Sequence, residues 1–158
     1  MKVSIITITY NSESTLIDTI DSVLSQTYKD IEYIIVDGGS TDSTLSIVHS
    51  YKDKIAKFVS EKDNGLYDAL NKGIAMASGD VVGIIHSDDF YTSHHTIENV
   101  VHAFKAEHAD AVYADLFYVD KHDTNKIHRR WKSGRYKHGM FLNGWIPPHP
   151  TFFVKRTV

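Results

Sequence analysis

The sequence predicts an α/β protein with a mainly parallel sheet that carries helices on both faces. Apolar runs of strand length alternate four times with segments whose apolar residues follow a helical period, which is the pattern of successive βαβ units. The length of 158 residues, with 42% hydrophobic and 23% charged residues, fits a single soluble domain. No apolar run approaches the roughly 18 residues that cross a bilayer. We therefore expect a cytoplasmic protein without a signal peptide.

The first part of the chain predicts three strands and two helices. Residues 3–9 and 31–36 are rich in β-branched residues, as buried parallel strands are. Between them, apolar residues at offsets 0, 4, 7 and 8 share one helical face and predict a helix over about 14–26: Leu16, Ile20, Val23 and Leu24. A second helix runs through Leu45, Val48 and Tyr51, with Ser40 or Asp42 as its N-cap, and a third strand follows at 56–60.

The next part predicts two more helices and up to three strands. A third helix is marked by Leu66, Leu70 and Ile74, and Ser78-Gly79 is expected to end it as a glycine C-cap. A strand at 81–85 precedes a fourth helix with apolar residues at offsets 0, 3, 4 and 7: Ile97, Val100, Val101 and Phe104. Strands are expected at 111–119 and 126–131, and later residues have weak periodicity. We expect one domain over 1–158, with a regular half at 1–108 and an irregular half at 109–158.

Charge and cysteine content exclude several functions. A formal charge of −3 gives no basic stripe for nucleic-acid binding, so we expect no nucleic-acid partner. Without cysteine there is neither a disulfide framework nor a thiolate metal site. A metal would be held by carboxylates, histidines or substrate oxygens, which favours Mg²⁺ or Mn²⁺.

Polar and acidic residues follow the carboxyl ends of four predicted strands, where the ligand crevice of an open parallel sheet lies. They are Tyr10-Asn11, Asp37-Gly38-Gly39, Glu61-Lys62-Asp63 and Asp88-Asp89. Ordinary solvation of loops explains any one of these groups about as well as a binding site does. Acids at three of these four strand ends are more than a soluble sheet requires, and this clustering is what points to a site.

Several of these residues allow two interpretations. Of the adjacent carboxylates Asp88 and Asp89, one can bind a metal while the other accepts hydrogen bonds from a sugar hydroxyl, but Asp89 can equally be a helix N-cap. Asp37 can accept from a base or a ribose hydroxyl, or simply belong to a turn. Asn71 and Lys72 can point into the crevice, or Lys72 can form a surface ion pair with Asp68.

Histidine is abundant but scattered. His94-His95, His102 and His108 lie on or beside the predicted fourth helix, away from the strand ends, and are expected to be solvated. His149 differs because the prolines around it, in Ile146-Pro147-Pro148-His149-Pro150, fix its backbone in the half that must face the crevice. We therefore keep His149 as a candidate functional residue.

These motifs together resemble the N-terminal part of a family 2 glycosyltransferase with the glycosyltransferase-A (GT-A) fold. The resemblance covers essentially the whole chain and is strongest over residues 3–90. It rests on residues 3–11, Ile34 through Asp42, Asn64-Gly65 through Asn71-Lys72-Gly73-Ile74 to Ala77-Ser78-Gly79-Asp80, Ser87-Asp88-Asp89, and Pro148 through Phe153.

The resemblance implies inverting transfer of a sugar from a nucleoside-diphosphate donor, often a UDP-sugar, to a hydroxyl acceptor in cell-surface glycan synthesis. It implies that Thr9, Tyr10 and Asp37 bind the base and ribose, with Asn11, Asn71 and Lys72 also on the donor side. Asp88 would contact the ribose or sugar. Asp89, with His149 as a further candidate, would hold the Mg²⁺ or Mn²⁺ that bridges the diphosphate.

Three departures from the family pattern limit this expectation. His86 stands where many members have an acid. Leu70 stands where many have an arginine that contacts phosphate, and Lys72 would supply this contact instead. The family's catalytic base lies in a motif beyond the Pro-His segment, and the sequence ends at Val158 before it. Because Asp115, Asp120 and His149 do not match its position, no catalytic base is assigned.

We accordingly expect a glycosyltransferase domain cut short on its acceptor side, with a glycan or lipid-linked glycan as acceptor. Membrane association at the inner face would come from segments outside this sequence. The alternative is a nucleotide-sugar-binding module with little turnover, since losing a base costs roughly 10²–10⁴-fold in rate.

Three other α/β classes are excluded by particular residues. A dinucleotide-binding domain would need a glycine-rich turn after the first strand, and residues 10–14 contain no glycine. A sugar nucleotidyltransferase would normally have a glycine-rich basic loop there. A receiver domain would carry its acid pair at the first strand, whereas here the pair follows the fourth.

Overall fold

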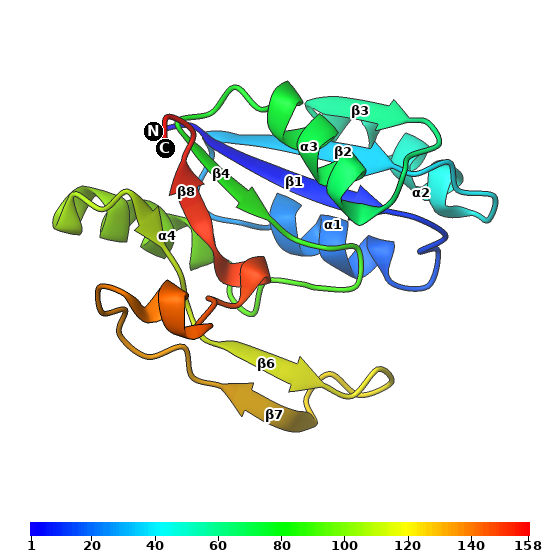
Figure 1. Cartoon of the computed structure of the whole chain (residues 1–158). Helices are drawn as coiled ribbons and strands as arrows, with labels where there is room; N and C mark the ends of the chain where they lie inside the picture. The colour runs from blue at the N-terminus through cyan, green and yellow to red at the C-terminus, as the bar shows by residue number, and fades with distance from the viewer.

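The computed structural model describes residues 1–158 and confirms the α/β architecture with a mostly parallel sheet. The central sheet has six strands in the order β3-β2-β1-β4-β8-β5 (Figure 1). Four of them are mutually parallel: β1 (Val3–Thr9), β2 (Ile31–Asp37), β3 (Lys57–Ser60) and β4 (Val81–Ile84). The short strand β8 (Phe153–Lys155) is antiparallel to β4 and to β5 (Ala111–Val112), between which it lies.

Helices cover both faces of this sheet. One face is packed by α1 (Leu16–Leu24), α2 (Thr44–Ser50) and α4 (Thr96–Glu107), whose buried residues form the larger core cluster with one side of β1 and β2. The four apolar residues predicted to face the core from the fourth helix are all buried. The other face is packed by α3 (Leu66–Met76), which closes a smaller cluster around Ile6, Ile8 and Ile34. Short 3₁₀ turns occupy Lys52–Lys54, Met140–Asn143 and His149–Thr151.

Helix α3 does not bury the apolar stripe that the sequence predicts. Leu66 is 51% exposed and Ile74 is 43% exposed, whereas Ala69 and Gly73 are buried. A methyl group placed on Gly73 would overlap Cγ2 of Ile6. Small residues therefore bring the helix backbone close to β1, Leu66 and Ile74 are turned outward, and Leu70 packs half-buried against the smaller cluster.

The predicted glycine C-cap of α3 is also wrong. The helix ends at Met76, its C-cap residue Ala77 has an extended backbone, and Gly79 does not have the positive φ of a left-handed cap. Gly79 is instead needed for space, because a Cβ there would lie 2.8 Å from the carbonyl oxygen of Lys2 and from the amide nitrogen of Ser4.

The single strand predicted over residues 111–119 is two strands in two different sheets. After β5, the chain leaves the central sheet, and β6 (Leu116–Val119) pairs antiparallel with β7 (Ile127–Trp131). Residues 114 and 115 fix this departure. Ser133 donates its amide to Oδ1 of Asp115 at 2.8 Å and its hydroxyl to the carbonyl oxygen of Ala114 at 2.7 Å.

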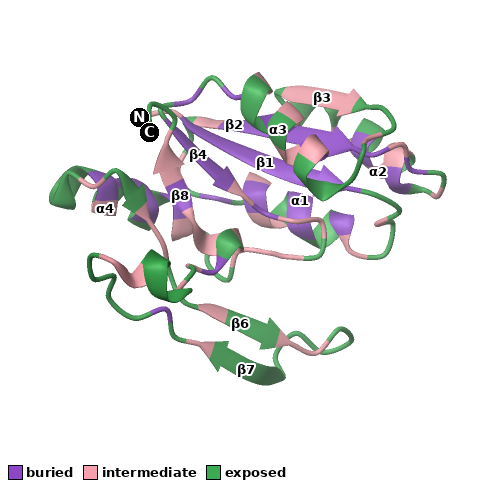
Figure 2. Cartoon of the chain, in the orientation of Figure 1, coloured by how far each residue is buried: buried purple, intermediate pink, exposed green.

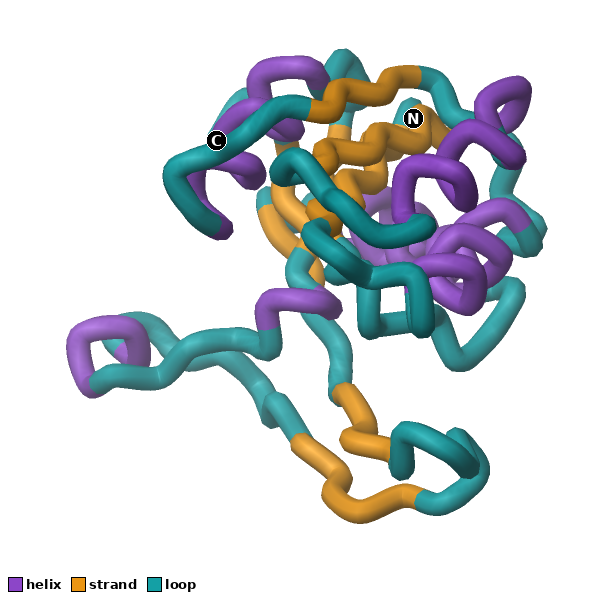
Figure 3. Tube along the Cα trace, turned by 90° about the vertical axis from the view of Figure 1, so that its right-hand side faces the viewer, coloured by secondary structure: helices purple, strands orange, loops and turns teal.

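The β6–β7 hairpin projects from the body of the molecule as an arm (Figures 1 and 3). Most residues of this arm are exposed, in contrast to the buried strands of the central sheet (Figure 2). None of the helices has the length and apolar character that spanning a membrane requires.

A buried carboxylate anchors the end of the sheet opposite to the carboxyl ends of its strands. Glu32 is 4% exposed and accepts hydrogen bonds from the Ser4 hydroxyl at 2.6 Å and from the Ser78 amide at 2.7 Å. The ammonium groups of Lys2 and Lys57 each lie 3.1 Å from Oε1. Burial would raise the pKa of this carboxyl, but the hydrogen bonds from Ser4 and Ser78 outweigh it and hold the pKa far below its ordinary value.

Candidate functional site

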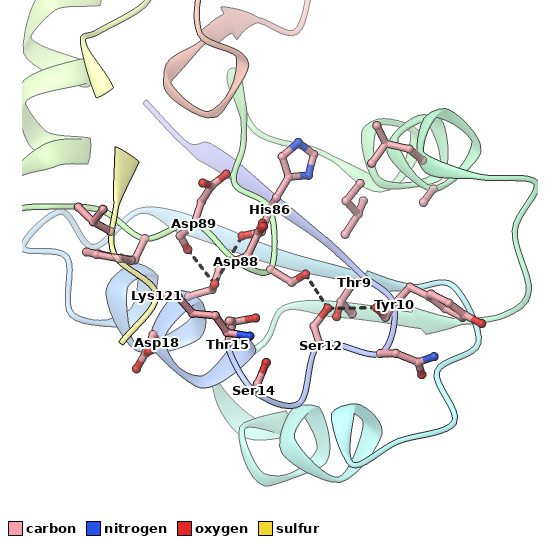
Figure 4. A pocket seen from close by; sticks show the side chains of 18 of the residues that line it. Thr9, Tyr10, Ser12, Ser14, Thr15, Asp18, His86, Asp88, Asp89 and Lys121 are labelled. Atoms are coloured by element: carbon pink, nitrogen blue, oxygen red, sulfur yellow. Dashed lines mark hydrogen bonds between the residues drawn. The ribbon is translucent and has the colours of Figure 1, made fainter. Parts of the chain in front are cut away.

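A cleft of about 670 Å³ opens at the carboxyl ends of β1 and β4 (Figure 4). We call it the strand-end cleft. Its walls come from the loop after β1 with the first turns of α1, from the start of α3, from the loop after β4, and from the turn of the β6–β7 hairpin. The cleft lies where the crevice of an open parallel sheet is expected. Of the predicted site residues, it is lined by Thr9, Tyr10, Asn11, Asp88 and Asp89.

Thr9, in the wall of this cleft, has a buried hydroxyl without a hydrogen-bond partner. It is the last residue of β1 and is only 5% exposed, yet its Oγ1 has no hydrogen-bond partner. A buried hydroxyl without a partner costs about 1–3 kcal/mol, which a bound ligand would recover. Tyr10 follows it and is 62% exposed, so its ring is free to pack against a ligand at the cleft.

Asn11 joins the loop after β1 to the turn after β2. Its backbone has φ of 48°. Its backbone N–H donates to Oγ of Ser40 at 2.8 Å, and its side-chain Oδ1 accepts from the backbone N–H of Thr41 at 2.8 Å. The left-handed conformation is one that Asn tolerates better than most residues. These bonds fix the wall of the cleft next to Tyr10.

Asp37 lies behind this turn and outside the cleft lining. It is fully buried, and its carboxylate accepts the amides of Gly39 and Ser40 at 3.0 Å and the Ser60 hydroxyl at 2.6 Å, together with the Ser40 hydroxyl. In this structure, Asp37 therefore organises the turn that carries Ser40 and Thr41. A direct contact between Asp37 and a ligand stays a prediction.

Asn71 and Lys72 also lie outside the lining of the strand-end cleft. Asn71 is exposed on α3. The ammonium of Lys72 lies 2.9 Å from Glu61 and 3.2 Å from Asp68, so the surface ion pair considered from the sequence is present. A donor-side role for either residue stays a prediction.

Asp88 and Asp89 lie in the loop that follows β4. Asp88 is exposed, whereas burial and the charge of Asp88 together raise the pKa of the Asp89 carboxyl. The Thr19 hydroxyl holds this loop by donating to the carbonyl oxygen of Asp89 at 2.7 Å. The next helix has His95 at its N-cap position, so the alternative that Asp89 caps a helix is wrong.

His149 lies close to this loop and packs against His86. The two imidazole rings meet edge to face, with centroids 5.0 Å apart. Burial and the neighbouring His149 lower the pKa of His86. His149 forms no ion pair with Asp89 within 4.0 Å, and its assignment as a metal ligand stays a prediction.

A second cleft of about 790 Å³ lies between α4, the Pro-His segment and the β6–β7 hairpin. We call it the hairpin cleft. Half of its lining is apolar, including Phe90, Tyr91 and Trp131. His86, Asp88 and Asp89 line both clefts. The two spaces therefore meet at the pair of carboxylates.

The donor atoms at this junction suit a hard divalent cation only in part. Asp88 and Asp89 offer carboxylate oxygens, which Mg²⁺ and Mn²⁺ prefer. No group of three His, Asp or Glu side chains is arranged to hold a metal ion by itself. A cation bound by these carboxylates would need oxygens of a bound ligand to complete its coordination shell.

Sequence reasoning missed two parts of the strand-end cleft. One is the segment that follows the predicted Tyr10-Asn11, in the loop after β1 and the first turn of α1. Its residues in the cleft are Ser12, Ser14, Thr15, Asp18 and Thr19. The other is the hairpin turn, where Asp120 is a candidate only as a substitute for the catalytic base, and where Lys121 and Thr124 carry no local signal of a site. The hairpin residues reach the cleft only because the turn of the arm lies beside the loops that follow β1 and β4.

The chain matches the family model described as Glycosyl transferase family 2 over residues 4–155. It is 36% identical over 122 residues to the UDP-Glc:alpha-D-GlcNAc-diphosphoundecaprenol beta-1,3-glucosyltransferase WfaP of Escherichia coli, covering 75% of this chain and 47% of that protein. It is 39% identical over 106 residues to an uncharacterized glycosyltransferase of Mycobacterium tuberculosis, covering 66% of this chain and 40% of that protein. The chain thus spans less than half the length of these relatives.

Solved structures give the same fold. The S. aureus TarS 1-349 structure in complex with UDP matches 99% of this chain and 47% of that chain, with a TM-score of 0.78 and 25% identity. The mannosyltransferase PcManGT from Pyrobaculum calidifontis, in complex with GDP-Man and Mn²⁺, matches 78% of this chain and 37% of that chain, with a TM-score of 0.66 and 27% identity.

Proposed function

Because the chain belongs to glycosyl transferase family 2, with a GT-A fold, we propose that its strand-end cleft binds a nucleoside-diphosphate sugar. In this proposal the sugar is transferred, with inversion, to a hydroxyl acceptor in the hairpin cleft. The observation that carries the proposal is the meeting of the two clefts at Asp88 and Asp89. A donor in one cleft and an acceptor in the other would bring the reacting atoms together there.

The donor residues follow from the lining of the strand-end cleft. Tyr10 packs against the base, the unpartnered Thr9 hydroxyl bonds to the nucleoside, and Asn11 holds the wall beside them. Asp88 accepts from a ribose or sugar hydroxyl. A uridine nucleotide is supported by the UDP-Glc in the name of WfaP and by the UDP in the TarS complex.

Asp89, together with oxygens of the diphosphate, would hold Mg²⁺ or Mn²⁺. The cation would neutralise the charge that grows on the leaving diphosphate as the glycosidic bond breaks. The Mn²⁺ in the PcManGT complex supports this choice of cofactor. The Thr19 hydroxyl contributes by fixing the backbone of Asp89.

A nucleotide-sugar-binding module with little turnover is the second candidate function. It is supported by the hydrogen bonding of the two acids that could replace the catalytic base, Asp115 and Asp120. Oδ1 of Asp115 accepts the Ser133 amide, and Asp120 is bonded to His128 and to two amides of its own turn. Both oxygens of Asp120 are therefore engaged, whereas Asp115, whose Oδ2 accepts no hydrogen bond, does not match the position of the family's base. Release of UDP from a UDP-sugar in the presence of an acceptor identifies the enzyme, and binding without release identifies the module.

Calorimetry with UDP in the presence and absence of Mn²⁺ tests the donor site. We expect binding that is strengthened by the metal. If neither UDP nor another nucleoside diphosphate binds with Mn²⁺ present, the proposed function is wrong.

A further inference from the structure

The charge that lines the strand-end cleft is unbalanced. Its lining includes the five acids Asp18, Asp63, Asp88, Asp89 and Asp120, but Lys121 is its only lysine or arginine. A nucleoside diphosphate carries at least two negative charges at neutral pH, so such a lining opposes its entry. One divalent cation at Asp89 offsets only part of this charge. The diphosphate therefore needs a further positive group within the cleft.

Lys121 is the side chain that can supply it. Its ammonium forms no hydrogen bond and no ion pair within 4.0 Å, in contrast to Lys72, which is held by Glu61 and Asp68. Figure 4 shows Lys121 reaching into the cleft toward Thr15, on the side of Asp88. An unpaired ammonium in a cleft rich in carboxylates is available to a bound anion.

The hairpin turn fixes the backbone next to Lys121. Oδ1 of Asp120 accepts the amides of His122 at 2.9 Å and Asp123 at 3.2 Å, and its Oδ2 lies 3.1 Å from Nε2 of His128. The Asp120 amide donates to the carbonyl oxygen of Lys126 at 2.9 Å. Asp120 is therefore fixed by the turn and by β7, and this fixes the backbone from which Lys121 projects.

We propose that the ammonium of Lys121 binds the diphosphate of the nucleotide donor. This inference rests on the proposed function, and it assigns to the β6–β7 arm a contact that the motifs of residues 3–90 do not contain. Lys121 is then a donor-binding residue that distinguishes a diphosphate from an uncharged nucleoside. The arm contributes to donor binding as well as to the hairpin cleft.

The test compares UDP with uridine, each in the presence of Mn²⁺, for the wild type, Lys121→Ala, Lys121→Arg and Lys132→Ala. Calorimetry measures UDP, and competition against UDP measures the weaker uridine. We expect Lys121→Ala to weaken UDP binding about tenfold, as loss of a charge-assisted hydrogen bond does, and to leave uridine binding unchanged. Lys121→Arg should keep most of the affinity for UDP. Lys132→Ala removes an exposed charge from the same arm, outside both clefts, and should change nothing.

Each other result has a definite meaning. Wild-type affinity of Lys121→Ala for UDP overturns the assignment and leaves the donor site intact. An equal loss of UDP and uridine affinity also overturns it, since Lys121 would then act on the shape of the cleft. An equal loss in Lys132→Ala would show a long-range effect of net charge in place of a contact. Failure of the wild type to bind UDP or any other nucleoside diphosphate with Mn²⁺ present overturns the proposed function, and the assignment of Lys121 with it.

Discussion

Gly73 on α3 packs directly against Ile6 on β1, with no room between them for a Cβ atom. We expect Gly73→Ala to lower the free energy of unfolding by about 1–3 kcal/mol, because the gain in helix propensity is smaller than the cost of forcing the helix off the sheet. Ile74→Ala, on the exposed side of the same helix, should change it by less than about 1 kcal/mol. Urea unfolding measures both. A larger loss for Ile74→Ala than for Gly73→Ala would contradict the packing described above.

Glu32→Gln should remove the charge from the buried network around Ser4 and Ser78. We expect the free energy of unfolding at pH 7 to fall by about 1.5–3 kcal/mol, as expected for hydrogen bonds to a charged group. The control is Glu107→Gln, since Glu107 is exposed and forms no ion pair, and this substitution should have no measurable effect.

Comparing the wild type with Glu32→Gln also tests how the contribution of Glu32 to the free energy of unfolding depends on pH. The folded-state pKa of Glu32 lies below its unfolded value of roughly 4.3, so its contribution is fully present above about pH 4.3 and is lost as the pH falls below it. The stability difference between the wild type and Glu32→Gln should therefore shrink between pH 5 and the acid limit of folding. A difference that stays constant over this range would show that the carboxylate charge is not what stabilises the network.

Thr9→Val should separate binding from stability. Because Oγ1 of Thr9 has no partner, replacing it with a methyl group should leave the unliganded protein equally stable or more stable by up to about 1 kcal/mol. UDP affinity should fall about five- to tenfold. Thr7→Val is the matched control on the same strand. The Thr7 hydroxyl is hydrogen-bonded to Tyr33 at 3.0 Å, so this variant should lose stability and keep its affinity for UDP. Unchanged UDP affinity in Thr9→Val would remove Thr9 from the donor site.

Asp89→Ala should abolish the effect of Mn²⁺ on UDP binding, because Asp88 alone offers too few oxygens to hold the ion. Calorimetry with and without Mn²⁺ should then give the same affinity, at least about tenfold below that of the wild type with metal. Asp53→Ala, an exposed acid far from both clefts, should keep the full metal dependence. Metal dependence that persists in Asp89→Ala would place the cation elsewhere.

Local pattern was sufficient to predict much of the regular half of the chain. The strand at Val3–Thr9 has the predicted bounds, and the four predicted core residues of α4 are buried, because each is fixed by a strong local period. The face of α3 was wrong because Ala69 and Gly73 are buried for their small size, which a hydrophobic period does not register. The predicted strand at 111–119 was divided by hydrogen bonds from Ser133, which is distant in sequence.

The candidate site was predictable to the same extent. Thr9, Tyr10, Asn11 and Asp88 line the strand-end cleft because the carboxyl ends of parallel strands must meet. Asp37 ends such a strand too, but its carboxylate is turned into the loop behind the cleft. Lys121 could not be found in this way, since only the fold of the whole arm brings it to the cleft.

The place of β8 in the sheet has a consequence for folding. Val82 on β4 and Ala111 on β5 both pair with Val154, so the sheet beyond β4 cannot form until the entire arm between β5 and β8 has been made. Because β8 comes last in the chain, these pairings form only after β1, β2, β3 and β4 have all been made. During synthesis, the strands that carry the strand-end cleft therefore assemble before the sheet is complete. For that interval the unpaired edge of β4 is open to another chain, which makes the growing polypeptide most prone to aggregate just before Phe153–Lys155 arrives.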